Sequence, residues 1–292
     1  MSPPGWPVPA ELDRLRRSED GRRWLAELPV LISAVRRRWS VEMGAPFQGG
    51  RVSYVAPATG ADGGRYVVKV TWPHPEAEHE AAALAAWDGN HAIRLLDHAP
   101  DLGALLVELC DPGTPLSSLD PDDALDVLVD LLPRLWVPAS APFTTLADAA
   151  TGWAEGLLPA WERAGRPFER RLVELATEHL QQLGPTGHES VLLHQDLHAG
   201  NVLAATRMPW LAIDPKPLVG EPVFGLAPII RGRELGHGRE AVLHRLDRLT
   251  AELRLDRQRA IGWTIGHTLA WGFYDGQVIA SHVDVVRWLG DG

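Results

Sequence analysis

The chain has 292 residues, of which 45% are hydrophobic and 23% are charged, a composition typical of folded globular proteins and unlike that of disordered chains. Its formal net charge of −10 excludes nucleic acid and anionic membrane surfaces as expected partners; it either favours a cationic small molecule or only keeps the chain in solution. The N-terminus lacks the apolar core of a secretory signal, no apolar run reaches the roughly 18 residues that span a bilayer, and the single cysteine, Cys110, cannot form an internal disulfide, so we expect a cytoplasmic protein.

The first half of the chain predicts helices followed by an antiparallel sheet. Helical periodicity in residues 10–40 ends at "GAPFQGG" (44–50). The segments "RVSYVAPA" (51–58) and "RYVVKVTW" (65–72) then flank a glycine-rich link, which indicates a hairpin. An alanine-rich helix is predicted for 75–87, and two more strands are predicted within 92–110.

The second half is predicted to be mostly helical. Three helices are expected at 121–136, 146–164 and 168–183, and two more at about 239–254 and 257–279. Two short apolar strands, 190–194 and 210–214, lie between these groups. The pattern predicts an α+β protein with two lobes: a β-rich lobe over residues 1–109 and a larger helical lobe over residues 110–292.

A polar loop in "VLLHQDLHAGNVL" (191–203) is the strongest functional signal. It presents His194, Asp196 and Asn201 between two short strands, and the strand that follows ends at Asp214. Carboxylate and amide oxygens suit Mg²⁺, so Asn201 and Asp214 are candidate ligands, which leaves Asp196 to act as a base. One alternative is that the cluster only caps a turn. A second is that His194, Asp196 and His198 bind a transition metal in a hydrolase.

Lysine is rare in this chain: only Lys69 and Lys216 are lysines among the 28 basic residues. A compact ammonium serves where the planar guanidinium does not fit, so both positions are functional candidates. Lys69 alternates with valines in a predicted strand, and either Glu76 or Glu80 on the following helix could hold its ammonium. The alternative is a lysine that protects the edge of a sheet.

Two adjacent glycines, Gly49 and Gly50, precede the first predicted strand of the hairpin, where small residues let backbone amides approach an anion. Taken alone, this pair is also typical of an ordinary turn. Together with the strand lysine, the helix acid, the His-x-Asp-x-x-x-x-Asn loop and the later aspartate, it completes the set of parts found in protein-kinase-like phosphoryl transfer.

From about residue 45 to the C-terminus, the sequence resembles the aminoglycoside phosphotransferases, and most closely their streptomycin 6-kinase and hydroxyurea phosphotransferase group. The resemblance rests on "VVKV", "HPEAEHEAAAL", "ALLVELCDPGTPL", "LLHQDLHAGNVL" and "WLAIDPKPLVGEPVFGLAPIIR". It implies a protein-kinase-like two-lobed fold and the ATP- and Mg²⁺-dependent transfer of a phosphoryl group to a hydroxyl of a small, cationic acceptor such as streptomycin. It favours neither a monomer nor a dimer.

The resemblance also implies roles for individual residues. Asp196 corresponds to the base that orients or deprotonates the acceptor hydroxyl, and Lys216 is a candidate for stabilising charge on the transferred group. Asn201 and Asp214 correspond to the Mg²⁺ ligands. The remaining nucleotide-binding positions are Gly49, Gly50 and Lys69 for the phosphates, Glu80 (or Glu76) for holding Lys69, and Val107, Glu108 and Cys110 in the segment that binds adenine.

Two departures from the family pattern motivate a further alternative. Gln195 stands where relatives usually have glycine, and Gly225 stands where they usually have an aspartate that braces the catalytic loop; Pro217 also replaces a usual glycine. A pseudo-kinase that binds nucleotide without turnover would fit these changes.

The predicted C-terminal helix offers three possible acceptor contacts, Trp271, Tyr274 and Asp275. The alternative is that its aromatic residues belong to the core, as aromatic residues in helices more often do.

Overall fold

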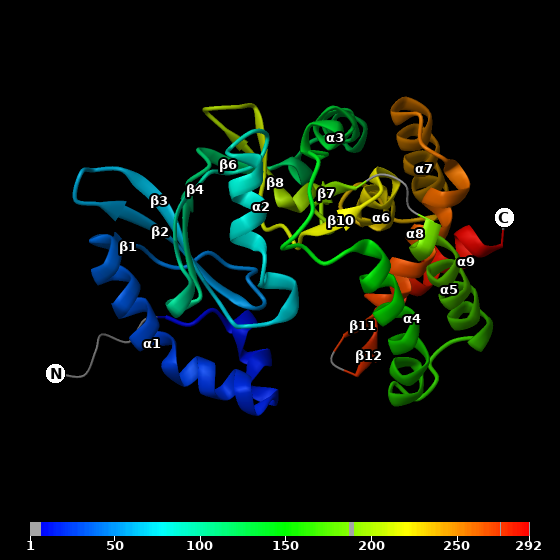
Figure 1. The fold of residues 1–292 in the computed structure, drawn as a ribbon, viewed down its shortest axis with the longest axis horizontal. Helices are drawn as coiled ribbons and strands as arrows, with labels where there is room; N and C mark the ends of the chain where they lie inside the picture. The colour runs from blue at the N-terminus through cyan, green and yellow to red at the C-terminus, as the bar shows by residue number, and fades with distance from the viewer. Residues whose placement is uncertain (1–6, 187–189, 275, 292) are drawn as a thin grey trace. The chain divides into compact units, whose positions relative to one another are not determined.

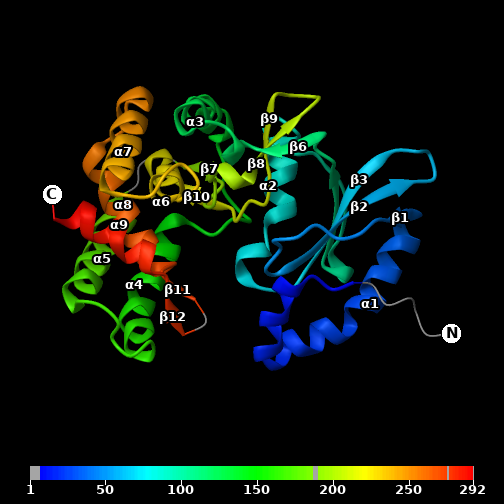
Figure 2. The same cartoon turned by 180° about the vertical axis from the view of Figure 1, so that it is seen from behind.

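The computed structural model describes residues 7–186, 190–274 and 276–291. Two compact units make up the chain, Met1–Gly113 and Thr114–Gly292. Among the described residues, no helix is both long enough and apolar enough to cross a membrane. Figures 1 and 2 show the elements of each unit.

A five-stranded antiparallel sheet forms the centre of the first unit, with strand order β1-β2-β3-β5-β4. The predicted hairpin and the two later strands are confirmed as β2, β3, β4 and β5. In chain order the unit contains η1 (Ala10–Arg17), α1 (Glu19–Trp39), β1 (Val41–Met43), β2 (Ser53–Gly60), β3 (Arg65–Thr71), η2 (Pro75–Ala77), α2 (Glu80–Trp87), β4 (Leu95–Ala99), η3 (Pro100–Leu102), β5 (Ala104–Glu108) and the start of β6 (Pro112–Pro115).

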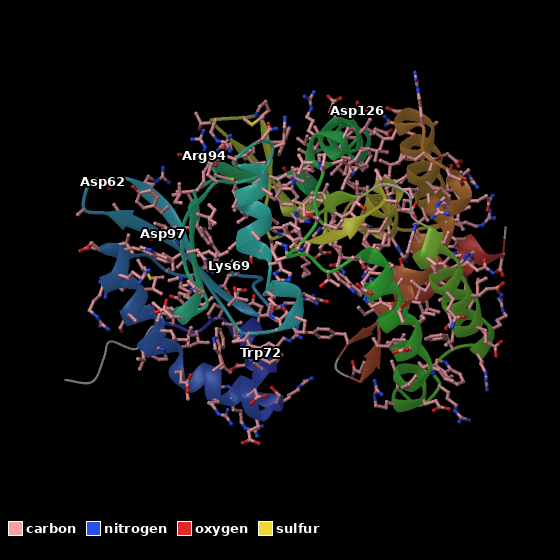
Figure 3. The ribbon with its side chains drawn as sticks, viewed as in Figure 1. Asp62, Lys69, Trp72, Arg94, Asp97 and Asp126 are labelled. Carbon is pink, nitrogen blue, oxygen red and sulfur yellow. The ribbon has the colours of Figure 1, made fainter. Side chains whose placement is uncertain are left out.

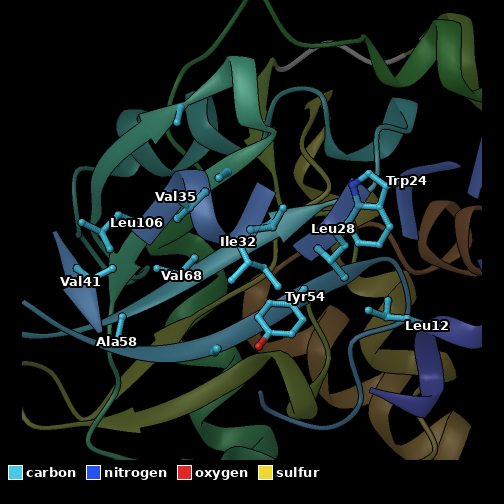
Figure 4. Close-up of a cluster of buried hydrophobic side chains, with 14 of the residues drawn as sticks. Leu12, Trp24, Leu28, Ile32, Val35, Val41, Tyr54, Ala58, Val68 and Leu106 are labelled. Atoms are coloured by element: carbon cyan, nitrogen blue, oxygen red, sulfur yellow. The ribbon is translucent and has the colours of Figure 1, made fainter. Parts of the chain in front are cut away.

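The alternation of side chains along these strands gives the sheet two different faces. Tyr54 pairs with Val70 and Ala56 with Val68, and these four buried residues belong to the core cluster that packs against α1. Figure 4 shows this cluster, with Leu28 and Ile32 of α1 beside Tyr54 and Val68 of the sheet. Since Lys69 lies between Val68 and Val70, its side chain belongs to the opposite face, and Figures 1 and 2 show α2 on that side.

The second unit is mainly helical. Its elements are η4 (Leu116–Ser118), α3 (Pro121–Leu135), α4 (Leu146–Arg163), α5 (Arg170–Leu183), η5 (Gly184–Thr186), β7 (Val191–Leu193), η6 (Ala199–Asn201), β8 (Val202–Ala205), β9 (Trp210–Ala212), β10 (Leu218–Gly220), η7 (Pro222–Leu226), α6 (Ala227–Arg231), α7 (Arg239–Leu253), α8 (Arg257–Ala270), β11 (Phe273–Tyr274), β12 (Gln277–Val278) and α9 (Ala280–Gly290). Strands β7 and β10 pair antiparallel, as do β8 and β9.

Helix α8 is the central helix of this unit. All residues from Gly262 to Leu269 are buried, as expected for a helix covered on every side. Two of its glycines allow α5 to approach closely: a Cβ at Gly262 would lie 2.7 Å from Leu183, and one at Gly266 would lie 2.7 Å from Leu180. Neither position has room for a larger side chain without movement of its neighbour.

Two sequence predictions are wrong at the ends of helices. The helix predicted for 257–279 ends at Ala270, and the β11–β12 hairpin and a separate helix, α9, follow it. Glycines explain the break, because Gly272 follows the last turn and Gly276 has a φ of 72°. The helix predicted for 75–87 begins only at Glu80, since η2 is a separate short turn and His79 lies outside helical geometry.

Candidate active site

A buried ion pair joins Lys69 of β3 to Glu80, the first residue of α2. The Lys69 Nζ lies 2.7 Å from both carboxylate oxygens of Glu80, and the two side chains are only 10% and 6% exposed. Glu76 lies in η2 and is exposed, so the structure brings Glu80 and not Glu76 to the lysine. Figure 3 labels Lys69 within the sheet.

The backbone amide of Gly49, in the glycine pair before β2, already donates a hydrogen bond within the first unit. The Gly49 N–H donates to the carboxylate of Glu11 at 3.1 Å, so an anionic oxygen lies at the amide that was predicted to approach a phosphate. Gly49 has a φ of 96°, and a Cβ at Gly50 would lie 2.6 Å from the Ser53 carbonyl oxygen. Both positions therefore require glycine for the backbone path itself.

The segment predicted to bind adenine lies at the end of β5. The Glu108 N–H donates to the Arg94 carbonyl at 3.0 Å, and the Glu108 carboxylate accepts the Arg94 N–H at 3.0 Å. Val107 and Cys110 are buried. The backbone N–H of Glu108 is therefore already used within this unit; Arg94 is labelled in Figure 3.

The polar loop of the second unit (residues 194–201) leaves β7 through a tight turn at Gln195. The Asp196 N–H donates to the His194 carbonyl at 2.8 Å, and Gln195 between them has a φ of 64°. A side chain in this region costs about 1 kcal/mol or more relative to glycine, so Gln195 makes under strain the turn that glycine would make freely. The Lys216 N–H donates to the same carbonyl at 3.0 Å, which ties this turn to the segment after β9.

The side chain of Asp196 is held by two cations. Lys216 Nζ donates to Oδ2 of Asp196, and the Arg231 guanidinium lies 3.5 Å from Oδ1. The backbone of Asp196 is fixed as well, because the Asn201 amide donates to its carbonyl at 2.9 Å. The Asp196 side chain is 15% exposed, so the carboxylate is enclosed by protein on most sides.

Asn201 and Asp214 are brought together by the β8–β9 hairpin. Val202 pairs with Ala212, and the Ile213 N–H donates to the Asn201 carbonyl at 2.9 Å, so Asp214 follows directly after the partner of Asn201. Because the Asn201 amide nitrogen is directed at the loop backbone, its Oδ1 is the atom that a cation would meet. The pair supplies the hard oxygen donors that Mg²⁺ prefers, and the residues fit that ion.

The two histidines of the loop make contacts within the second unit. His194 is buried, and its Nε2 is 2.9 Å from the Ile213 carbonyl; burial is the main cause that lowers the pKa of His194 to about 4. The Nδ1 atom of His198 contacts the carboxylate of Glu234. Burial raises the pKa of Glu234, but the hydrogen bond from His198 and other contacts outweigh it and lower that pKa to about 2.

Gly225 lies in η7 among mainly apolar neighbours. A Cβ there would be 3.6 Å from both the Leu132 side chain and the Trp136 indole nitrogen. In relatives, an aspartate at this position usually braces the loop. In this chain, the contacts that hold Asp196 come instead from Asn201, Lys216 and Arg231.

The sequence motifs did not identify Arg231 or the residues around it as part of the site. The Arg231 NH1 lies 2.8 Å from Nδ1 of His267, and the Trp271 ring lies 4.9 Å from the guanidinium and 5.3 Å from the Lys216 ammonium. The only sequence signal was an arginine at the end of the apolar segment "APII". Tyr274 lies in β11 and is half-buried, whereas Asp275 lies outside the described residues.

Buried histidines in this unit make its stability depend on pH. Burial, followed by the charge of Arg231, lowers the pKa of His282 to about 4, and the same two causes lower the pKa of His267 well below 6.5. Between pH 6.5 and 4 the unfolded chain binds protons that the folded chain does not, so this stabilisation is complete above pH 6.5 and is lost as the pH falls.

We expect His282→Gln to flatten the pH dependence of the free energy of unfolding. Each such histidine adds a slope of about 1.4 kcal/mol per pH unit in this range. Urea unfolding of the wild type and the variant at several pH values from 7 to 4.5 measures the difference. Parallel curves for the two proteins would show that His282 titrates normally in the folded state.

The fold is that of the protein-kinase-like small-molecule phosphotransferases. The structure resembles the choline kinase LicA of Streptococcus pneumoniae (TM-score 0.63, 12% identity, covering 90% of this chain and 99% of that one). It also resembles a thermostable mutant of the aminoglycoside phosphotransferase APH(4)-Ia in a ternary complex with ADP and hygromycin B (TM-score 0.60, 14% identity, covering 89% of this chain and 98% of that one).

Sequence relatives identify the family. The model of the aminoglycoside/hydroxyurea antibiotic resistance kinases matches residues 38–276. The streptomycin 6-kinase of Streptomyces griseus is 39% identical over 269 residues, which cover 88% of this chain and 87% of the relative. The hydroxyurea phosphotransferase of Kitasatospora aureofaciens is 37% identical, covering 95% and 84%. The chain belongs to the aminoglycoside/hydroxyurea antibiotic resistance kinase family.

Proposed function

We propose that the protein transfers the γ-phosphoryl group of ATP, in the presence of Mg²⁺, to a hydroxyl of a small cationic molecule, with a streptomycin-like aminocyclitol as the leading acceptor. The observation that carries this proposal is the placement of Asp196. A carboxylate held on both oxygens by cations, beside a loop that presents Asn201 and Asp214, suits a residue that orients and deprotonates a hydroxyl.

The residues around Asp196 and around Lys69 have separate roles in this reaction. Asp196 accepts the proton of the attacking hydroxyl, and Lys216, beside it, stabilises negative charge on the group in transfer. Asn201 and Asp214 would hold Mg²⁺, which neutralises phosphate charge when bound. Lys69 binds the α- and β-phosphates, and Glu80 holds its ammonium in place.

The acceptor is inferred from charge and from the relatives. A net charge of −10 attracts a cation over long range, and the named relatives act on streptomycin and hydroxyurea. The Trp271 ring is not assigned to the acceptor, because it already contacts Lys216 and Arg231. Tyr274, in the β11 strand that follows α8, remains a candidate acceptor contact.

Two alternatives from the sequence find less support. A transition-metal hydrolase would need His194, Asp196 and His198 as ligands, but His194 contacts the Ile213 carbonyl and His198 contacts Glu234, and no group of three potential metal-binding side chains occurs in the described part of the chain. A pseudo-kinase was suggested by Gln195 and Gly225, yet Gln195 makes its turn and Asp196 is fully braced.

The test is phosphoryl transfer from ATP with Mg²⁺ to a panel of streptomycin, hygromycin B, hydroxyurea and small amino alcohols. We expect turnover on an aminocyclitol, detected as ADP release and as a mass gain of one phosphoryl group on the acceptor. Binding of ATP without turnover on any acceptor would favour the pseudo-kinase. Absence of ATP binding would contradict the proposed function.

A further inference from the structure

Arg231 is a buried cation at the edge of the candidate active site. It is the last residue of α6, and its side chain is only 8% exposed. Desolvating a guanidinium is costly unless charged or polar partners compensate for the lost water. Asp196 is its ion-pair partner and His267 accepts from its other terminal nitrogen, so one planar fork joins these two side chains.

His267 must be neutral to make this contact. Arginine has only donors, so the 2.8 Å separation of Arg231 NH1 and His267 Nδ1 requires Nδ1 to accept and places the imidazole proton on Nε2. The Nε2 atom is buried and has no hydrogen-bond partner among the residues that the structure describes. The imidazole is surrounded by the rings of Trp153, Phe224 and Trp271 at 4.9, 4.9 and 4.5 Å, which offer no acceptor strong enough to stabilise an imidazolium.

The backbone that carries Arg231 is fixed by a second buried arginine. Arg245 of α7 is 2% exposed and donates twice to the Ile230 carbonyl, at 2.8 and 3.2 Å. It also donates to the carbonyls of Leu235 and Gly236, at 2.8 and 3.0 Å. These bonds satisfy carbonyls at and beyond the end of α6 that have no helical partner, and they limit the movement of the Arg231 Cα.

The two oxygens of Asp196 are held by different cations. Lys216 contacts Oδ2 and Arg231 contacts Oδ1. Rotation of an aspartate carboxylate about its last bond is soft, so a single cation would leave the plane of the carboxylate free to turn. Two cations on opposite oxygens fix that plane, and each oxygen keeps a second lone pair for the acceptor hydroxyl.

We propose that Arg231, oriented by a neutral His267, is a positioning residue that fixes the plane of the Asp196 carboxylate for proton acceptance. The proposal rests on the proposed function. Arg231 acts through Asp196 and not on the phosphoryl group. A lysine at this position would keep the charge but could not bind Asp196 and His267 in one plane.

The kinetic test compares Arg231→Lys, His267→Phe and His267→Asn with the wild type. Misorientation of a catalytic group costs up to about 100-fold in rate, so we expect Arg231→Lys and His267→Phe to lower kcat by about 10- to 100-fold with little change in the KM for ATP. His267→Asn, which restores an acceptor near the Nδ1 position, should recover part of the loss. Wild-type kcat in Arg231→Lys would overturn the proposal.

A matched control separates positioning from general destabilisation. Arg259 of α8 makes a similar two-pronged contact with Glu221, at 2.9 and 2.5 Å, away from Asp196. Arg259→Lys should lower the melting temperature and leave kcat unchanged. An equal loss of kcat in Arg259→Lys and Arg231→Lys would contradict the proposal, because it would show that Arg231 acts only through the stability of the fold.

Nitrogen NMR of the histidine side chains tests the contact without turnover. We expect His267 to carry its proton on Nε2 in the full-length protein and its Nδ1 resonance to shift in Arg231→Lys. A proton on Nδ1 would overturn the proposal. If the wild type phosphorylates no acceptor, the proposed function fails, but the NMR result still decides whether His267 accepts from Arg231.

Discussion

Asp196→Asn is expected to lower kcat for phosphoryl transfer by about 10²- to 10⁴-fold, the usual contribution of a positioned general base. Asparagine keeps the size of the side chain but cannot accept the proton of the acceptor hydroxyl. It also places an amide where Lys216 and Arg231 now meet two carboxylate oxygens. Nucleotide affinity should stay near the wild-type value, because Asp196 is not assigned to the phosphates.

Steady-state transfer and calorimetric titration with ATP measure the two effects separately. Asp126→Asn is the control, since Asp126 of α3 also pairs with an arginine, Arg248 at 2.6 Å, but is 64% exposed; Figure 3 labels it. This control should keep wild-type kcat. A wild-type rate in Asp196→Asn would assign the base to another residue.

Glu80→Ala is expected to destabilise the first unit by about 3–5 kcal/mol, because it leaves the Lys69 ammonium buried without its carboxylate. The double variant Lys69→Met/Glu80→Leu should recover most of this loss, since apolar side chains of similar volume need no charged partner. The double variant should also lose ATP binding if Lys69 contacts the phosphates as proposed.

Urea unfolding of Lys69→Met, Glu80→Leu and the double variant, each beside the wild type, forms a mutant cycle for this pair. Asp13→Asn is the control: Asp13 and Arg16 form an exposed ion pair at 2.7 Å, and such pairs contribute less than about 1 kcal/mol. Additive effects of the Lys69 and Glu80 substitutions would mean that the two residues are not coupled.

The sequence predicted the parts of the site that depend on local spacing. Alternation in "YVVKV" placed Lys69 on the face opposite Val68 and Val70. The strand–loop–strand pattern predicted the turn that carries Asp196 and Asn201. The choice between Glu76 and Glu80 could not be made from spacing, because it depended on where α2 begins, and helix starts without a side-chain cap leave no clear signal.

Contacts between distant segments could not be predicted. Arg231 lies 35 residues from Asp196 and 36 from His267 in the sequence, and no periodic pattern connects these positions. The hydrogen bond from the Gly49 N–H to the Glu11 carboxylate could not be predicted either, because 38 residues separate the two positions. The helix predicted through 279 failed because apolar residues continue beyond Ala270 while the glycines end the helix.

The scarcity of lysine has a consequence for chemical labelling of this protein. Its only two side-chain amines, Lys69 and Lys216, each lie in an ion pair and are 10% and 18% exposed. Acylating reagents need an accessible amine, and each of these two is largely enclosed by protein and donates to a carboxylate. Because the remaining basic side chains are arginines, which these reagents do not modify, any acyl group found on a side-chain amine would mark the opening of one of these two clusters.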